Sequence, residues 1–206
     1  MLPIYKIATE PAAEPVLKDD FKLHRRLAID AAGAVAYDYE DDTIDGFILS
    51  SRKWVEHITG RALITQTWDM YLQWWPSGDF IEIGKPPLQS VTYVKYTDSN
   101  DVVTTWSPDE YSVDTDSDPG RIVLNYGCSW PDFTPHPKNP INIRFVAGYG
   151  AAGSNVEPDI ILAIKLLVGH YYINRENSYA AGVNMDIKEI PMGVMSLLAN
   201  HRRVGF

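Results

Sequence analysis

The pattern of apolar and polar residues divides the chain into a helical first part, a strand-rich middle and a helical last part. Apolar residues recur at intervals of three and four over residues 40–59, which predicts an amphipathic helix. Acidic residues crowd its first turns, and Gly60 stands where a helix stop is expected. A shorter helix is predicted over residues 18–27. Residues 1–15, with three prolines, predict an extended arm.

After Gly60 the apolar period changes to two, which is typical of strands. One strand face is predicted within residues 62–75, formed by Ile64, Trp68, Met70, Leu72 and Trp74. Six more short strands, each bounded by turn residues, are predicted over residues 80–83, 91–96, 102–106, 111–114, 121–124 and 141–147. We expect this middle third to form one antiparallel sheet, arranged as a meander.

The last third is predicted to be helical again. Residues 159–174 are apolar on almost every side of a helix, so this helix must be covered all round. The cover comes either from the rest of the monomer or from a neighbouring subunit, and the sequence leaves both open. A polar loop over residues 175–189 leads to a short helix over residues 192–201 and a tail over residues 202–206. The fold class is therefore α+β, with a small bundle of N-terminal and C-terminal helices and an antiparallel β-sheet inserted between the second and third helices.

Composition limits the possible functions. With 206 residues the chain is long enough for one domain, which we divide into 1–60 (arm and two helices), 61–150 (sheet) and 151–206 (C-terminal helices and tail). A net charge of −9 argues against a protein whose main function is to bind the phosphate backbone of DNA. DNA could still pass such a protein without binding to it. The single cysteine excludes a disulfide framework within the chain. We expect a soluble protein without a signal peptide or membrane contact.

The segment FVAGYGAAGSN, residues 145–155, has the glycine spacing of a dinucleotide-binding turn at Gly148, Gly150 and Gly153. Val156, Glu157 and Pro158 separate this segment from the next predicted helix, and no second parallel strand follows. The preceding strands also look antiparallel. We therefore interpret the glycines as a flexible crossing from the sheet to the helices, and we predict no cofactor.

Other motifs give no support for catalysis or metal binding. Asp114, Asp116 and Asp118 are spaced like the start of a calcium loop, but the glycine and the residue at position twelve do not fit, and a tight hairpin explains them. The five histidines are scattered, and Cys128 matches no protease signature. The aromatic residues favour core and interface packing, since no basic residues are seen interleaved with them on one face to support base stacking. We predict no catalytic, cofactor-binding or metal-binding residues.

The order of segments nevertheless resembles a known family. A proline-rich arm with EPAAEPVLKDDFKLHRRL precedes a helix that ends in GRALITQTW, and PPLQSV and the stretch from FVAGYG to HYYINRE follow. Over nearly the whole chain this is similar to the head-tail connector (adaptor) proteins of tailed bacteriophages and prophages. It is closest to the long variety, which carries a sheet between the second and third helices.

The resemblance implies a structural virion protein and not an enzyme. Such proteins form a homo-oligomeric ring, generally of twelve copies, under the portal protein after DNA packaging. The ring extends the DNA channel without sequence-specific binding and provides a platform for tail or stopper proteins. The expected location is the head-tail junction of the virion, with the host cytoplasm during assembly. The alternatives are another virion interaction protein, such as a tail-completion or stopper subunit, and an enzyme of unknown type.

Two sets of contact residues are predicted. His201, Arg202 and Arg203 are expected to meet an acidic surface of the portal, while a solvated basic end that balances a helix dipole remains the alternative. Lys165, Tyr171 and Tyr172 are expected at the interface between subunits, because they belong to the helix that is apolar all round.

Overall fold

A computed structural model describes residues 3–27, 40–174 and 192–202. Contacts along the chain divide it into two compact units. The strand unit comprises Met1–Ala12 and Arg61–Ala151, and the helical unit comprises Ala13–Gly60 and Ala152–Phe206. Each unit is built from two pieces of chain. The α+β class and the antiparallel pairing of the strands are confirmed.

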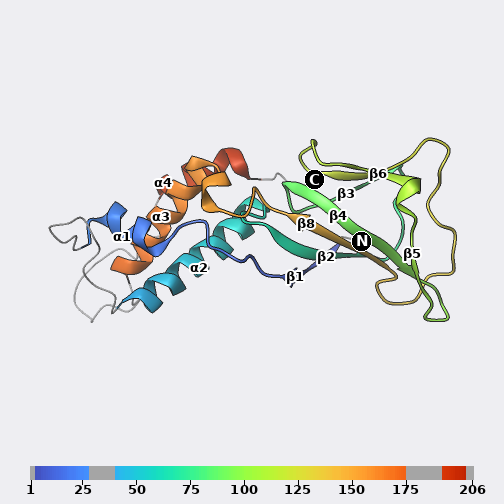
Figure 1. The fold of residues 1–206 in the computed structure, drawn as a ribbon, viewed down its shortest axis with the longest axis horizontal. Helices are drawn as coiled ribbons and strands as arrows, with labels where there is room; N and C mark the ends of the chain where they lie inside the picture. The colour runs from blue at the N-terminus through green and yellow to red at the C-terminus, as the bar shows by residue number, and fades with distance from the viewer. Residues whose placement is uncertain (1–2, 28–39, 175–191, 203–206) are drawn as a thin grey trace. The chain divides into compact units, whose positions relative to one another are not determined.

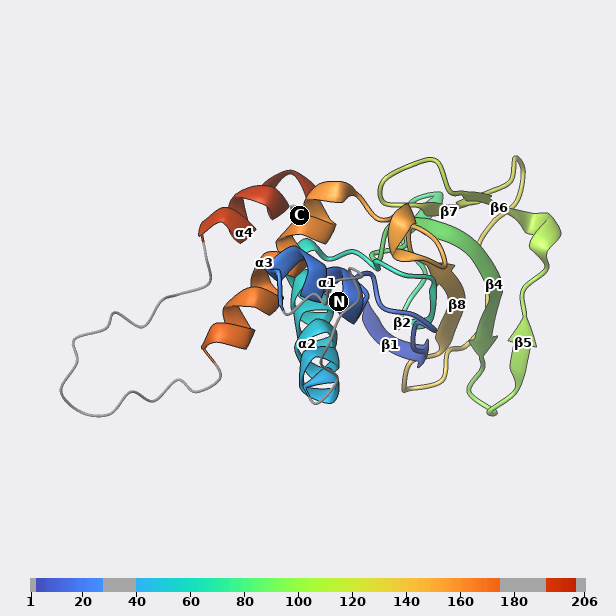
Figure 2. The same ribbon diagram turned by 60° about the vertical axis from the view of Figure 1, so that its left-hand side comes forward.

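The helical unit contains the four predicted helices: α1 (Lys18–Arg25), α2 (Asp41–Thr59), α3 (Pro158–Ile173) and α4 (Met192–Leu198). A short 3-10 turn, Ala199–His201, follows α4. Helix α3 contacts each of the other three helices, and Figure 2 shows it beside α4. Among the described residues, no helix combines the length and the apolar character needed to cross a membrane.

The strand unit holds two sheets and not the single meander that the sequence predicts. The first has the order β1 (Ile4–Thr9), β2 (Gln66–Leu72), β8 (Ile141–Ala147), β4 (Leu88–Thr97) and β5 (Val103–Thr105), as Figure 2 shows. The second has the order β3 (Phe80–Glu82), β7 (Arg121–Leu124) and β6 (Tyr111–Asp114). The meander is wrong because turn residues indicate where strands end but not which strand becomes the neighbour.

The last strand along the chain, β8, lies in the middle of the five-stranded sheet (Figure 1). Its residues alternate strictly between buried and half-buried, and it pairs along its whole length with both β2 and β4. The predicted arm contributes the edge strand β1, with Ile4 opposite Tyr71 and Ile7 opposite Trp68. Part of the arm is therefore extended as predicted, but it is held by sheet pairing.

The two sheets share one hydrophobic core. Its buried residues come from strands of both sheets and include Met70, Ile81, Val94, Ile122, Ile143 and Phe145. Of the residues predicted to share one strand face, Trp68, Met70 and Leu72 pack into this core. Ile64 is buried but lies outside this core cluster, and the prediction is wrong at Trp74, which is 65% exposed. Strand β2 ends at Leu72, so the alternation stops there, and Trp75 packs against the core instead.

The glycine-rich segment after β8 is closely packed. Gly148 has φ 133°, and a Cβ there would lie 2.5 Å from the carbonyl carbon of Ile64. The Tyr149 amide donates to the Leu63 carbonyl at 3.0 Å, and a Cβ on Gly153 would lie 2.0 Å from the Pro15 carbonyl oxygen. The glycines allow close backbone approach within each unit, and the flexibility expected of the crossing stays a prediction. The strand β8 before them is antiparallel to both neighbours, unlike the strand of a dinucleotide-binding turn.

We expect Gly148→Ala to lower the free energy of unfolding by about 2 kcal/mol or more, because alanine tolerates neither this φ nor this contact. Urea denaturation measures the change. Gly78→Ala, where a Cβ meets nothing within 4 Å, is the control and should stay within about 0.5 kcal/mol of the wild type. Equal losses in the two variants would contradict the close-packing account.

Candidate interaction surfaces

The aspartate-rich segment forms the turn between β6 and β7. The Asp114 carboxylate accepts hydrogen bonds from the backbone amides of Asp116 and Ser117, at 3.1 and 3.0 Å, and from the Ser117 hydroxyl. The Ser117 hydroxyl and amide lower the pKa of Asp114. Asp118 instead pairs with Arg61 at 2.6 Å. These carboxylates stabilise a hairpin, and no metal-holding group of three or more acidic, His or Cys side chains occurs among the described residues.

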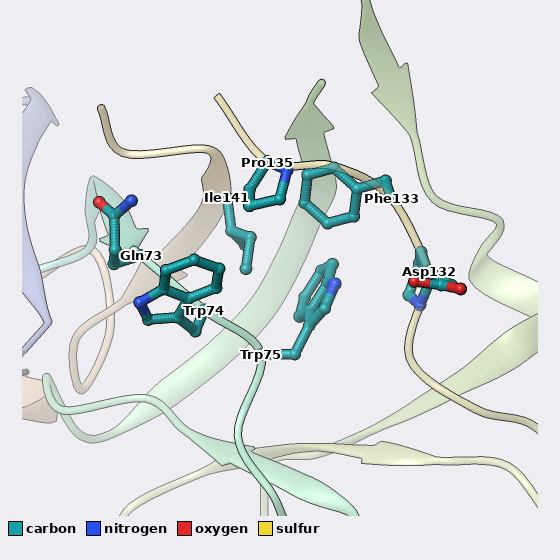
Figure 3. A pocket seen from close by; sticks show the side chains of 8 residues that line it. Gln73, Trp74, Trp75, Asp132, Phe133, Pro135 and Ile141 are labelled. Atoms are coloured by element: carbon teal, nitrogen blue, oxygen red, sulfur yellow. The ribbon is translucent and has the colours of Figure 1, made fainter. Parts of the chain in front are cut away.

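Most aromatic residues of the strand unit pack together. The rings of Trp75 and Trp130 are stacked at 5.2 Å, and Trp106 lies 5.7 Å from Trp75. Beside them is a hollow of about 130 Å³, and Figure 3 shows Trp74, Trp75 and Phe133 around it. Small-molecule sites usually enclose about 300–1,000 Å³. The aromatic cluster is therefore part of the packed interior, as predicted. The hollow beside it is smaller than a typical small-molecule site.

The tyrosines predicted at a subunit interface contact other parts of the helical unit. The ring of Tyr171 lies 6.2 Å from that of Phe47, and burial raises the pKa of Tyr171. The Tyr172 ring meets Phe21 edge to face at 6.0 Å, and its hydroxyl donates to Glu40. Tyr171 and Tyr172 are half-buried, as is the third predicted residue, Lys165. Their role between subunits stays a prediction.

A different set of α3 residues faces solvent. Leu162, Leu166 and Ile173 are 39%, 36% and 62% exposed. Their spacing of four and seven residues places them along one side of the helix, and we call them the α3 stripe. The opposite residues, such as Ile164 and Leu167, are fully buried. The sequence did not reveal this stripe, because a helix that is apolar on every side gives no sign of which side stays open.

The C-terminal basic residues are placed only in part. The imidazole Nε2 of His201 lies 3.8 Å from the Asp159 carboxylate, which is in the first turn of α3. Arg202 is exposed, and Arg203 lies outside the described residues. The end of the described chain is thus fixed near the start of α3 within the helical unit. This position presents Arg202 to solvent.

Buried ion pairs fix the segment before α1 to α2. The Arg52 guanidinium is 2% exposed, and it donates to Glu14 at 2.8 Å and to Glu56 at 2.9 Å. A second group joins Lys18 and Lys22 to Asp41, and hydrogen bonds from these two lysines lower the pKa of Asp41. These contacts connect α1, α2 and the chain that precedes them. They stabilise the helical unit.

A comparison with protein families matches residues 32–204 to the head completion protein family. The chain belongs to this family, which confirms its predicted structural role as a head-tail connector. A search of curated proteins gave no match.

Solved structures with the same fold come from phage-like particles. A chain in the neck of an empty GTA particle, computed with C6 symmetry, is 25% identical with a TM-score of 0.77 and covers 98% of this chain and 97% of that chain. A chain in the neck of a native GTA particle, computed with C12 symmetry, is 26% identical with a TM-score of 0.72, covering 100% and 97%. A chain in the virion of a native gene transfer agent is 24% identical with a TM-score of 0.76, covering 98% and 97%, and shows the shared fold.

We expect Arg52→Leu to lower the free energy of unfolding by about 3 kcal/mol, because it leaves largely buried carboxylates without their cation. Urea denaturation at neutral pH measures the loss. Lys53→Leu, at the exposed neighbouring position, removes the same charge and should cost less than about 1 kcal/mol. A loss in Arg52→Leu no larger than in Lys53→Leu would show that these pairs do not hold the unit together.

Proposed function

We propose that this protein forms a closed ring at the neck of a phage or prophage particle and joins the head to the tail. Its family membership and its likeness to neck chains solved with C6 and C12 symmetry support this position and a ring of twelve copies. The ring docks under the portal protein, continues the DNA channel and carries a tail or stopper protein. The chain acts at the head-tail junction of the virion and has no catalytic activity. That residues 1–206 act as a single connector domain stays a prediction.

The α3 stripe is the observation that carries the ring proposal. Leu162, Leu166 and Ile173 leave apolar surface in water on a helix whose other sides are buried. A ring of identical subunits places such a surface against a different part of the next copy, and closure prevents further growth. Burying a leucine or isoleucine side chain contributes about 1.5–3 kcal/mol at most, so three partly exposed side chains give a modest contact that is repeated around the ring. We also assign Lys165, Tyr171 and Tyr172 to the margin of this contact.

The portal contact is assigned to His201, Arg202 and Arg203 at the C-terminal end. These residues are basic, whereas the chain as a whole is acidic. His201 and Arg202 belong to the described residues. Arg202 is exposed in the structure. A stopper or tail-completion subunit is the second candidate, because it would share every compositional trait of this chain. It would bind the adaptor ring or the tail tube in place of the portal.

Mixing the purified chain with its cognate portal tests the proposal. Electron microscopy should show an added ring coaxial with the portal for the wild type. Leu166→Glu should abolish the ring, because it puts a charge into the proposed apolar contact. Leu49→Glu, which changes an equally exposed leucine on α2, should leave the ring intact. No association with the portal at any ratio, or the same loss in both variants, would contradict the proposal.

A further inference from the structure

One face of the five-stranded sheet lies opposite the shared core, and its side chains follow from the strand register. Lys6 of β1 is opposite Asp69 of β2, Asp69 is opposite Arg144 of β8, and Arg144 is opposite Tyr93 of β4. Residues directly opposite each other point to the same face. The next row continues from Tyr71 through Asn142 to Lys95. We call these residues the cationic sheet face: Lys6, Asp69, Tyr71, Tyr93, Lys95, Asn142 and Arg144.

The charge of this face is opposite to that of the chain. It carries three cations and one carboxylate, whereas the whole chain has a net charge of −9. The carboxylate of Asp69 is buried, and the Nε and Nη2 atoms of Arg144 both donate to it at 2.8 Å. These two bonds raise the pKa of Arg144 and fix its side chain. They leave the third nitrogen, Nη1, for another acceptor. Lys6 is exposed, so the positive charge reaches solvent.

Tyr93 positions one cation of its own strand, Lys95, and one of the neighbouring strand β8, Arg144. The Lys95 Nζ lies 4.2 Å from the centre of the Tyr93 ring, and the Arg144 guanidinium carbon lies 5.2 Å from it. The hydroxyl of a tyrosine is protonated at neutral pH and can donate a hydrogen bond, and burial raises the pKa of Tyr93 further. Because cations lie against this ring, it does not offer a free surface for stacking a base. The face presents donors and positive charge, which suit the phosphates of a nucleic acid better than its bases.

We propose that the cationic sheet face contacts the phosphate backbone of double-stranded DNA without regard to sequence. Of these cations only Lys95 is near Tyr93 in the sequence; Lys6 and Arg144 lie far from it in the chain, and the strand register brings them to the same face. Charge complementarity argues for a polyanion, and the choice of DNA rests on the proposed position in the neck. The acidic remainder of the chain repels DNA, so the contact is weak and a duplex can move past it.

Fluorescence anisotropy with the full chain and a labelled DNA duplex of arbitrary sequence tests this proposal over a range of salt concentrations. The wild type should bind at low salt. Lys6→Ala/Lys95→Ala should bind more weakly and should reduce the slope of log affinity against log salt by about 2, one for each lost phosphate contact. Lys53→Ala/Lys138→Ala removes the same charge at exposed positions elsewhere and should leave the slope unchanged.

Three results would overturn the proposal: no binding of the wild type at low salt, equal loss in both double variants, or displacement of DNA by polyglutamate as readily as by unlabelled DNA. The last result would assign the face to an acidic protein. The Lys6→Ala/Lys95→Ala variant should still add a ring to the portal, since its α3 stripe is intact. A failure of DNA binding is thus distinguishable from a failure of the ring.

Discussion

Helix α3 carries more apolar surface than the described residues of its own unit cover, and this excess is the basis of the proposed ring contact. Its inner residues, such as Ile164 and Leu167, are completely buried, and the helix contacts α1, α2 and α4. The remaining side keeps Leu162, Leu166 and Ile173 in water. A monomer gains nothing from these exposed side chains, whereas a ring of identical copies can bury all of them.

Polar contacts complement this apolar helix. Arg52 is buried between two carboxylates, and Lys22 is buried beside Asp41. Replacing both partners of a buried ion pair with apolar residues often changes the free energy of unfolding little, but removing one partner lowers it strongly. Such pairs therefore favour one particular arrangement of the segments that they join. In the strand unit, the close approach of Gly148 to Ile64 likewise favours one arrangement of two backbone segments. The ion pairs join α1 and the segment before it to α2, and α3, which carries the exposed apolar stripe, packs against both helices.

The sequence predicted local structure well where the signal itself is local. The helix over residues 40–59 and its stop at Gly60 follow from apolar spacing, acidic first turns and a left-handed glycine. The strands over residues 111–114, 121–124 and 141–147 follow from turn residues and alternation. The position of β8 between β2 and β4 depends on long-range pairing, which no local pattern encodes.

The candidate surfaces were harder to predict for two physical reasons. Tyr172 and Leu166 look equally suited to an interface in a helix that is apolar all round, and only packing shows that Tyr172 contacts Phe21 while Leu166 is exposed. The cationic sheet face requires the register of four strands, since its residues are contributed by β1, β2, β8 and β4. Family resemblance predicted the role of the protein, but it did not show which side chains perform it.

Hydrogen–deuterium exchange of the free chain and of the chain bound to its portal tests most directly whether subunits cover α3. Because the amides of a helix exchange more slowly when neighbouring chains restrict its opening, peptides spanning Pro158–Ile173 should gain protection on assembly. Peptides from β6 and β7 serve as an internal reference. Unchanged exchange across α3 in a fully assembled ring would contradict the account.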